Sequence, residues 1–100
     1  MQVITIMGNL TADAVEKNGN DNSKYVSFRV ACNSVRGDST TTTYYDVTKR
    51  PSAVDSYLKT GQKVTVVGRL NASARLGDEG KVFLNLNIAA FDLQLAGSKN

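Results

Sequence analysis

Residues 25–33, YVSFRVACN, alternate between apolar side chains and polar or small ones. Successive side chains of a β-strand point to opposite faces, so a period of two puts one set against a core and the other toward solvent. The core set comprises Val26, Phe28, Val30 and Cys32, and the outer set comprises Tyr25, Ser27, Arg29 and Ala31. A strand with one buried face needs neighbouring strands, so this segment commits the chain to a sheet that covers a core.

Other apolar or alternating segments predict further strands. They lie at residues 2–8, 43–50, 63–72 and 81–88, and residues 91–95 either continue the last strand or form a short additional one. Clusters of turn-forming residues predict loops or turns at 17–23, 36–42 and 76–80.

A short helix is predicted between the third and fourth strands, over residues 51–61. Pro51 suits the first turn of a helix, and Gly61 suits its C-cap. A chain of 100 residues is long enough for one domain. The predicted fold is therefore all-β: a five-stranded, partly open Greek-key barrel of the OB type, with one short helix between strands three and four. We expect the domain to cover residues 1–96 and a short tail to cover 97–100.

The two adjacent tyrosines of the third strand are predicted to differ in role. Alternation places Tyr45 with Val47 and places Tyr44 with Asp46. Because Val47 is a typical core residue, Tyr45 is predicted to point inward and Tyr44 outward.

Composition argues against enzyme classes that depend on metals or strong bases. The chain has no histidine and one cysteine, and it contains no glycine-rich phosphate-binding motif. We therefore expect no catalytic residues, no metal site and no cofactor. The lone Cys32 and the absence of a signal peptide favour the reducing cytoplasm of a bacterium or phage-infected cell. No apolar run approaches the ~20 residues that span a bilayer, so no membrane partner is expected.

The positions of the basic residues suggest an anionic partner more strongly than their number does. Lys and Arg total 12 and Asp and Glu total 9, a net charge of +3. An oligonucleotide-binding barrel needs cations along the phosphates and flat side chains that stack on bases. The candidate phosphate contacts are Arg29, Lys49, Arg50, Arg69, Arg75 and Lys81, and the candidate stacking platforms are Tyr44 and Phe83.

Each of these residues also has an ordinary structural interpretation. The cations could be solvated surface charges, and Phe83 could pack in a subunit interface. Tyr25 is predicted to pack under the 17–23 loop rather than to bind.

Four segments, in order, resemble the family of bacterial-type single-stranded DNA-binding proteins and their phage-encoded relatives. VITIMGNL, VSFRVACN and YYDVTKR resemble the first three strands of that family. YLKTGQKVTVVGRL, at 57–70, resembles the end of its helix and its fourth strand, including a Val-x-Val-x-Gly-x-Leu pattern.

The resemblance implies an OB-fold, usually assembled as a homotetramer, that coats single-stranded DNA without sequence preference. The family stacks bases on tryptophans, and this chain has none. Tyr44 falls at the third-strand aromatic position. Two other aromatic positions of the family fall near Arg36 and Arg75, so that stacking there would be by guanidinium planes or would be absent.

The resemblance also bears on partners. Cellular members end in a flexible tail with an acidic, proline- and phenylalanine-containing tip, whereas this sequence ends LAGSKN. We therefore expect no recruitment of replication proteins through an acidic tail. The expected function is single-stranded DNA binding in replication, recombination or repair by a homotetramer, or failing that a dimer. The alternative is an OB-fold protein-interaction module of a primosome-type complex that binds nucleic acid weakly.

Overall fold

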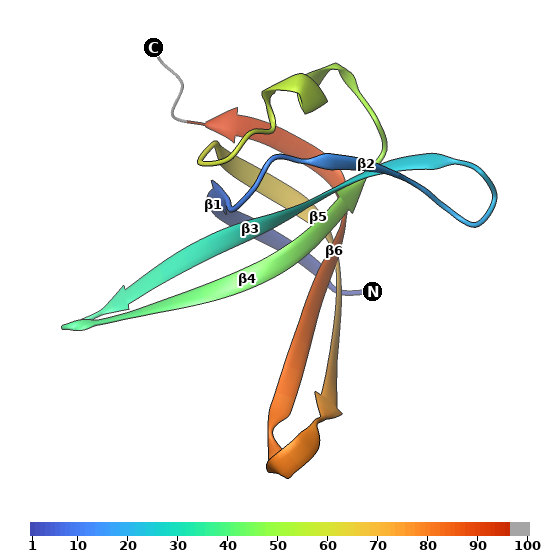
Figure 1. Ribbon diagram of the computed structural model, residues 1–100. Helices are drawn as coiled ribbons and strands as arrows, with labels where there is room; N and C mark the ends of the chain where they lie inside the picture. Colours follow the sequence, from blue (N-terminus) through green and yellow to red (C-terminus); the bar gives the residue numbers. More distant parts are fainter. Residues whose placement is uncertain (97–100) are drawn as a thin grey trace.

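The structure of the chain, a computed structural model, describes residues 1–96 and consists almost entirely of β-strands (Figure 1). The strands are β1 (Val3–Leu10), β2 (Val15–Asn18), β3 (Lys24–Arg36), β4 (Ser39–Lys49), β5 (Lys63–Leu76) and β6 (Val82–Ala96). Two 3-10 turns, η1 (Ala53–Tyr57) and η2 (Asp78–Gly80), precede β5 and β6 respectively. The predicted tail at 97–100 lies outside the described residues.

Five of the strands close into a barrel. Their order is β1-β5-β6-β4-β3, and β1 then pairs with β3 through Asn9–Ala31 and Leu10–Val30. β4 and β6 run parallel, while the other pairs are antiparallel. This arrangement confirms the predicted all-β OB-fold.

The barrel interior holds the predicted core residues Val26, Phe28, Val30 and Val47 together with apolar residues from other elements. The buried apolar residues are Ile6, Leu10, Val26, Phe28, Val30, Val47, Leu58, Val64, Val66 and Ile88. Tyr45 and Cys32 are half-buried and pack against this cluster, as predicted. Burial raises the pKa of the Cys32 thiol, which favours its protonated form.

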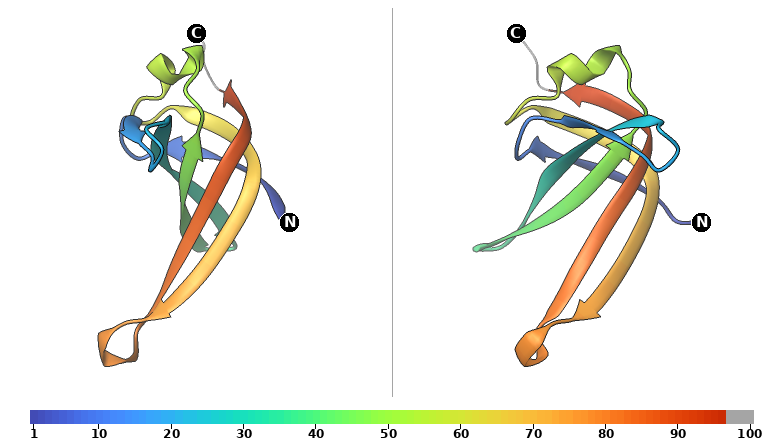
Figure 2. Two further views of the ribbon diagram at one scale, coloured as in Figure 1. Left: turned by 90° about the vertical axis from the view of Figure 1, so that its right-hand side faces the viewer. Right: turned by 45° about the vertical axis from the view of Figure 1, so that its right-hand side comes forward.

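Two hairpins extend as arms beyond the barrel (Figures 1 and 2). The β3–β4 arm corrects the prediction of a loop at 36–42: β3 runs to Arg36, and β4 begins at Ser39. Gly37 adopts a φ of +57° in the two-residue turn, and the β-branched threonines that follow extend readily as a strand. The β5–β6 arm carries the predicted turn at 76–80, where η2 lies.

A β-bulge explains why residues 91–95 look like a separate strand in the sequence. β6 is continuous, but its register against β5 shifts between Val67 and Gly68, which pair with Asp92 and Ala90. Phe91 is the extra residue, so the alternation of β6 changes phase there. Ile88 faces the core before the bulge, and Leu93 faces it afterwards.

The helix predicted over 51–61 is only the five-residue turn η1. The Asp55 carboxylate accepts a 2.7 Å hydrogen bond from the Ser52 backbone N–H and so fixes the first turn. Leu58 is buried but Tyr57 is exposed, so there is no apolar stripe to hold a longer helix. Gly61 is not the C-cap, because the turn ends at Leu58; Gly61 instead adopts a φ of +86° just before β5.

The 17–23 region is shorter as a loop than predicted. β2 takes Lys17 and Asn18 into a ladder with β3, pairing them with Tyr25 and Lys24. The remaining residues turn through Asn22, whose φ is +65°. β2 was missed because its four residues are all exposed and therefore show no alternation.

Candidate nucleic-acid interface

The two arms share one outer face, because three parallel pairs join β4 to β6: Asp46–Asn87, Val47–Ile88 and Thr48–Ala89. Side chains at paired positions point to the same side of a sheet. Val47 and Ile88 are buried, so their neighbours on both strands point outward. The outer face, as we call it, therefore runs across β3, β4, β6 and β5. Its rows are Ser27, Thr48, Ala89 and Arg69, then Arg29, Asp46, Asn87 and Asn71.

Tyr44 and Arg29 lie together on the outer face. Tyr44 is 55% exposed and pairs with Ala31, whose small side chain leaves the ring accessible. Arg29 donates a 2.9 Å hydrogen bond from Nε to the Asp46 carboxylate, which raises the pKa of the guanidinium. Both partners of this ion pair are about half exposed, so the pair is weak and a phosphate could compete for Arg29.

Arg75 and Phe83 form a second platform on the β5–β6 arm. They are paired across the strands, and the guanidinium carbon lies 4.9 Å from the ring centre. The ring also lies against Gly77, where a Cβ atom would come within 2.3 Å of Phe83 Cε2. The Arg75 guanidinium thus lies over the Phe83 ring. Lys81 joins them around a small groove of about 470 Å³ at the tip.

Lys49 is placed differently from the prediction of a phosphate contact. Its side chain is 9% exposed and forms an ion pair with Asp55. The ammonium also donates to the Arg50 carbonyl at 2.6 Å and to Ser52 Oγ at 3.0 Å. Lys49 therefore anchors η1 to the end of β4, and its charge is already satisfied within the fold.

The strand register places the other predicted phosphate-binding and stacking residues at different parts of the sheet. Arg69 belongs to the outer face through its pairing with Ala89. Arg36 follows the alternation of Cys32 and Ser34, so it lies on the opposite side of the β3–β4 arm from Tyr44. Arg50 follows the end of β4, and no acidic partner contacts it in residues 1–96.

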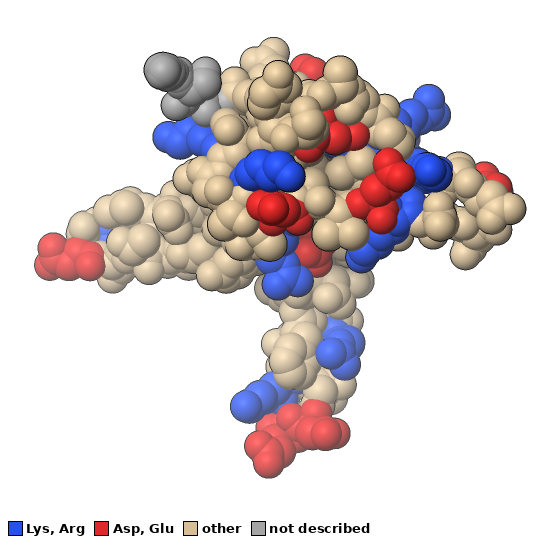
Figure 3. Space-filling model, turned by 45° about the horizontal axis from the view of Figure 1, so that its top comes forward, with Lys and Arg blue, Asp and Glu red and all other residues tan. Residues whose placement is uncertain are grey.

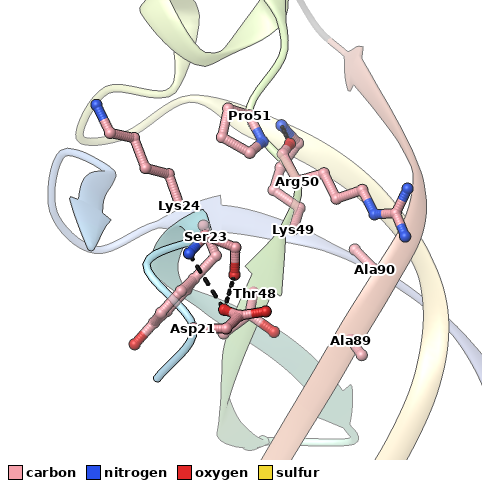
Figure 4. Close-up of a pocket in the computed structure, with 10 residues that line it drawn as sticks. Asp21, Ser23, Lys24, Thr48, Lys49, Arg50, Pro51, Ala89 and Ala90 are labelled. Atoms are coloured by element: carbon pink, nitrogen blue, oxygen red, sulfur yellow. Dashed lines mark hydrogen bonds between the residues drawn. The ribbon is translucent and has the colours of Figure 1, made fainter. Parts of the chain in front are cut away.

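Sequence reasoning missed a groove of about 920 Å³ beside Arg50 (Figure 4). It lies where β4 and β6 meet the 19–23 loop. Lys24 and Tyr25 of β3 line it, together with Asp21 and Ser23 of that loop. Tyr25 is half-buried and forms part of the groove wall. No local pattern could reveal the groove, because its residues come from separate segments.

Charges of both signs are interspersed over the face of the molecule that Figure 3 shows. Acidic residues mark the tips of both arms, with Asp38 in one turn and Asp78 and Glu79 in the other. In the described part of the chain no three His, Cys, Asp or Glu side chains gather as metal ligands do. Residues 1–96 also contain no helix long and apolar enough to cross a membrane.

A model of the Single-strand binding protein family matches residues 1–96. The chain belongs to this family. Its members bind DNA and are not enzymes, so the prediction that the chain is not an enzyme is confirmed. The comparison with curated proteins gives no match.

Two solved structures share the fold of this family member. One is the small single-stranded DNA-binding protein from Streptomyces coelicolor, with a TM-score of 0.74, 22% identity, and coverage of 94% of this chain and 93% of that one. The other is the Plasmodium falciparum single-strand binding protein in complex with single-stranded DNA, with a TM-score of 0.71, 20% identity, and coverage of 97% and 96%.

The position of Lys49 generates a prediction about stability. Lys49→Met keeps most of the side-chain stem but leaves the Asp55 carboxylate without its cation. We expect the free energy of unfolding to fall by roughly 2 kcal/mol, less than for a fully buried pair because Asp55 keeps some contact with water. Arg50→Ala, one residue along, should change it by less than about 0.5 kcal/mol. Urea unfolding monitored by circular dichroism measures the stability of both variants. Equal losses of stability would contradict the role of Lys49 as the partner of Asp55.

Proposed function

We propose that this chain binds single-stranded DNA without sequence preference, along the outer face, in replication, recombination or repair. The observation that carries the proposal is the register of the sheet, which gathers Arg29, Tyr44, Arg69, Arg75 and Phe83 on one continuous face. The ligand of the Plasmodium falciparum relative is consistent with it.

The proposed binding mode follows from the kinds of side chain on this face. Guanidinium groups contact phosphates, which every nucleotide carries. Tyr44 stacks on a base, and the Arg75–Phe83 pair offers a second flat surface. Because every base has a π-face, both interactions tolerate any sequence. The setting we propose is the cytoplasm of a bacterium or phage-infected cell, which suits the free Cys32 thiol.

The two tyrosines give the sharpest test of the stacking assignment. Tyr44→Ala should weaken binding to poly-dT by ~1–3 kcal/mol and leave the melting temperature nearly unchanged. Tyr45→Ala should instead cost about 3 kcal/mol of stability, because its ring packs against the core.

Tyr44→Phe is the matched control, since phenylalanine still stacks. It should bind nearly as well as the parent protein, while much of the quenching of tyrosine emission by DNA disappears. Full affinity in Tyr44→Ala would remove this residue from the binding mode.

Salt dependence tests the phosphate contacts. If Arg29, Arg50, Arg69 and Arg75 each contact a phosphate, a plot of log K against log salt should have a slope near −3, at roughly 0.7 per contact. Arg69→Ala should make the slope less negative by about 0.7 for every sequence tested. Lys59→Ala, a cation beyond η1, should leave it unchanged. Weak, salt-independent binding would favour the alternative of a protein-interaction module.

We further propose that the protein is a homotetramer, or failing that a dimer. Beside the outer face, β1 exposes Val3 and Met7, and Phe91 projects from the bulge of β6, each more than half exposed. Exposed apolar residues of this size commonly mark protein interfaces. Light scattering at micromolar concentration should give a mass of several 10.8 kDa chains, and Met7→Asp should lower it. A stable monomer of the parent protein would overturn this proposal.

A further inference from the structure

Asp46 is an acidic residue in the middle of the outer face, where cations are expected. Up to the bulge of β6, the outward positions of the four strands within residues 1–96 carry one carboxylate, that of Asp46. The arginines at outward positions of the same area are Arg29, Arg69 and Arg75. Asp46 lies between Arg29 and Asn87 in one row of the sheet. A DNA strand that crosses this face must therefore pass a negative charge.

Asp46 pairs with only one of these arginines. Arg29 donates a 2.9 Å hydrogen bond from Nε to Asp46 Oδ1. Arg69 has no ion-pair partner within residues 1–96, and Arg75 lies over the Phe83 ring. The Arg29 and Asp46 side chains are 57% and 44% exposed, so a phosphate can reach both of them.

A phosphate that binds Arg29 meets the Asp46 carboxylate whichever side of the guanidinium it takes. At Nε it must replace the carboxylate and leave it without its cation. At the terminal nitrogens it lies beside a like charge. Two like charges about 4 Å apart in water repel strongly enough to lower a binding constant about fivefold. Either route makes the contact weaker than an unpaired arginine would give.

We propose that Asp46 is an autoinhibitory residue that competes with the phosphates of single-stranded DNA for Arg29 and so limits the affinity of the outer face. The inference rests on the proposed function and adds to it an element that opposes binding. An exposed ion pair is broken at little cost, so Asp46 lowers the affinity without closing the face. The bound strand is consequently held loosely at the centre of the sheet.

Asp46→Asn isolates the effect of the charge, because the amide oxygen still accepts a hydrogen bond from Arg29 Nε. The probe is a fluorescein-labelled poly-dT strand of about 30 nucleotides, longer than the site of one OB-fold, and its anisotropy reports binding. At about 0.1 M salt we expect Asp46→Asn to bind about fivefold more tightly than the parent protein, and the gain should shrink as salt screens the repulsion. The melting temperature should be nearly unchanged, because an exposed pair contributes little to stability.

A double-mutant cycle tests whether Asp46 acts through Arg29. In an Arg29→Ala background no cation draws a phosphate to Asp46, so Asp46→Asn should change the affinity by less than about twofold. In an Arg69→Ala background, which lacks a different arginine of the same face, Asp46→Asn should keep its full gain. Asp38→Asn removes the same charge from the turn of the β3–β4 arm, more than about 20 Å along the strand from Arg29, and should leave the affinity unchanged.

The outcomes distinguish this inference from the function on which it rests. Weaker or unchanged binding by Asp46→Asn would overturn it, because the carboxylate would then support the phosphate contact or be irrelevant to it. An equal gain in the Arg29→Ala background would also overturn it, because the charge would then act without Arg29. In each of these cases the parent protein still binds poly-dT, and the proposed function stands. Failure of both the parent protein and Asp46→Asn to bind poly-dT would overturn both proposals.

Discussion

The three parallel residue pairs between β4 and β6 are the contact on which the outer face depends. Each hairpin alone would be a two-stranded ribbon, which is marginally stable in water. Burial of Val47 and Ile88 at this contact joins the two ribbons, and the same register aligns their polar neighbours outside. Core packing and the proposed binding surface thus come from alternate residues of the same short contact. Because the contact is short, the hairpins diverge beyond it into separate arms (Figure 2).

The bulge opposite Gly68 completes this arrangement on the other side of β6. A Cβ atom at Gly68 would lie 2.5 Å from the Ala89 carbonyl oxygen and 2.6 Å from Ile88 Cγ2, so glycine permits the close approach of the two strands. The extra residue then reverses the facing of β6. Before it, Ala89 lies on the outer face with Arg69; after it, Leu93 and Leu95 return to the core. One strand can therefore contribute to the proposed binding face at one end and to the barrel core at the other.

Local patterns were sufficient for the barrel and insufficient for the site. Alternation assigned Val26, Phe28 and Val30 to the core and separated Tyr44 from Tyr45, because burial on one face leaves a period of two in the sequence. Alternation did not identify β2 or the tip of the β3–β4 arm. Both faces of these strands are exposed, so burial does not select apolar residues at every second position.

Which basic residues are accessible at the candidate site depends on contacts between segments that are distant in the sequence. Lys49 and Arg50 are adjacent and both basic, yet Lys49 is held by Asp55 and Arg50 opens onto the groove. Nothing in the local sequence distinguishes them. Arg36 likewise looks equivalent to Arg29 until alternation is counted along one uninterrupted strand, which a predicted loop at 36–42 did not allow.

The absence of tryptophan gives the outer face an unusual coupling between charge and stacking. At Tyr44 the flat surface is neutral, and a different residue of the same face, Arg29, carries the positive charge, so stacking and phosphate attraction can be removed independently. At Arg75 the flat surface is itself the cation, supported from beneath by Phe83. In the proposed binding mode, salt therefore weakens both contributions of Arg75 together, whereas it leaves stacking on Tyr44 largely intact. As ionic strength rises, the residual affinity should shift from the β5–β6 arm toward β4, so the two arms are not equivalent halves of one surface.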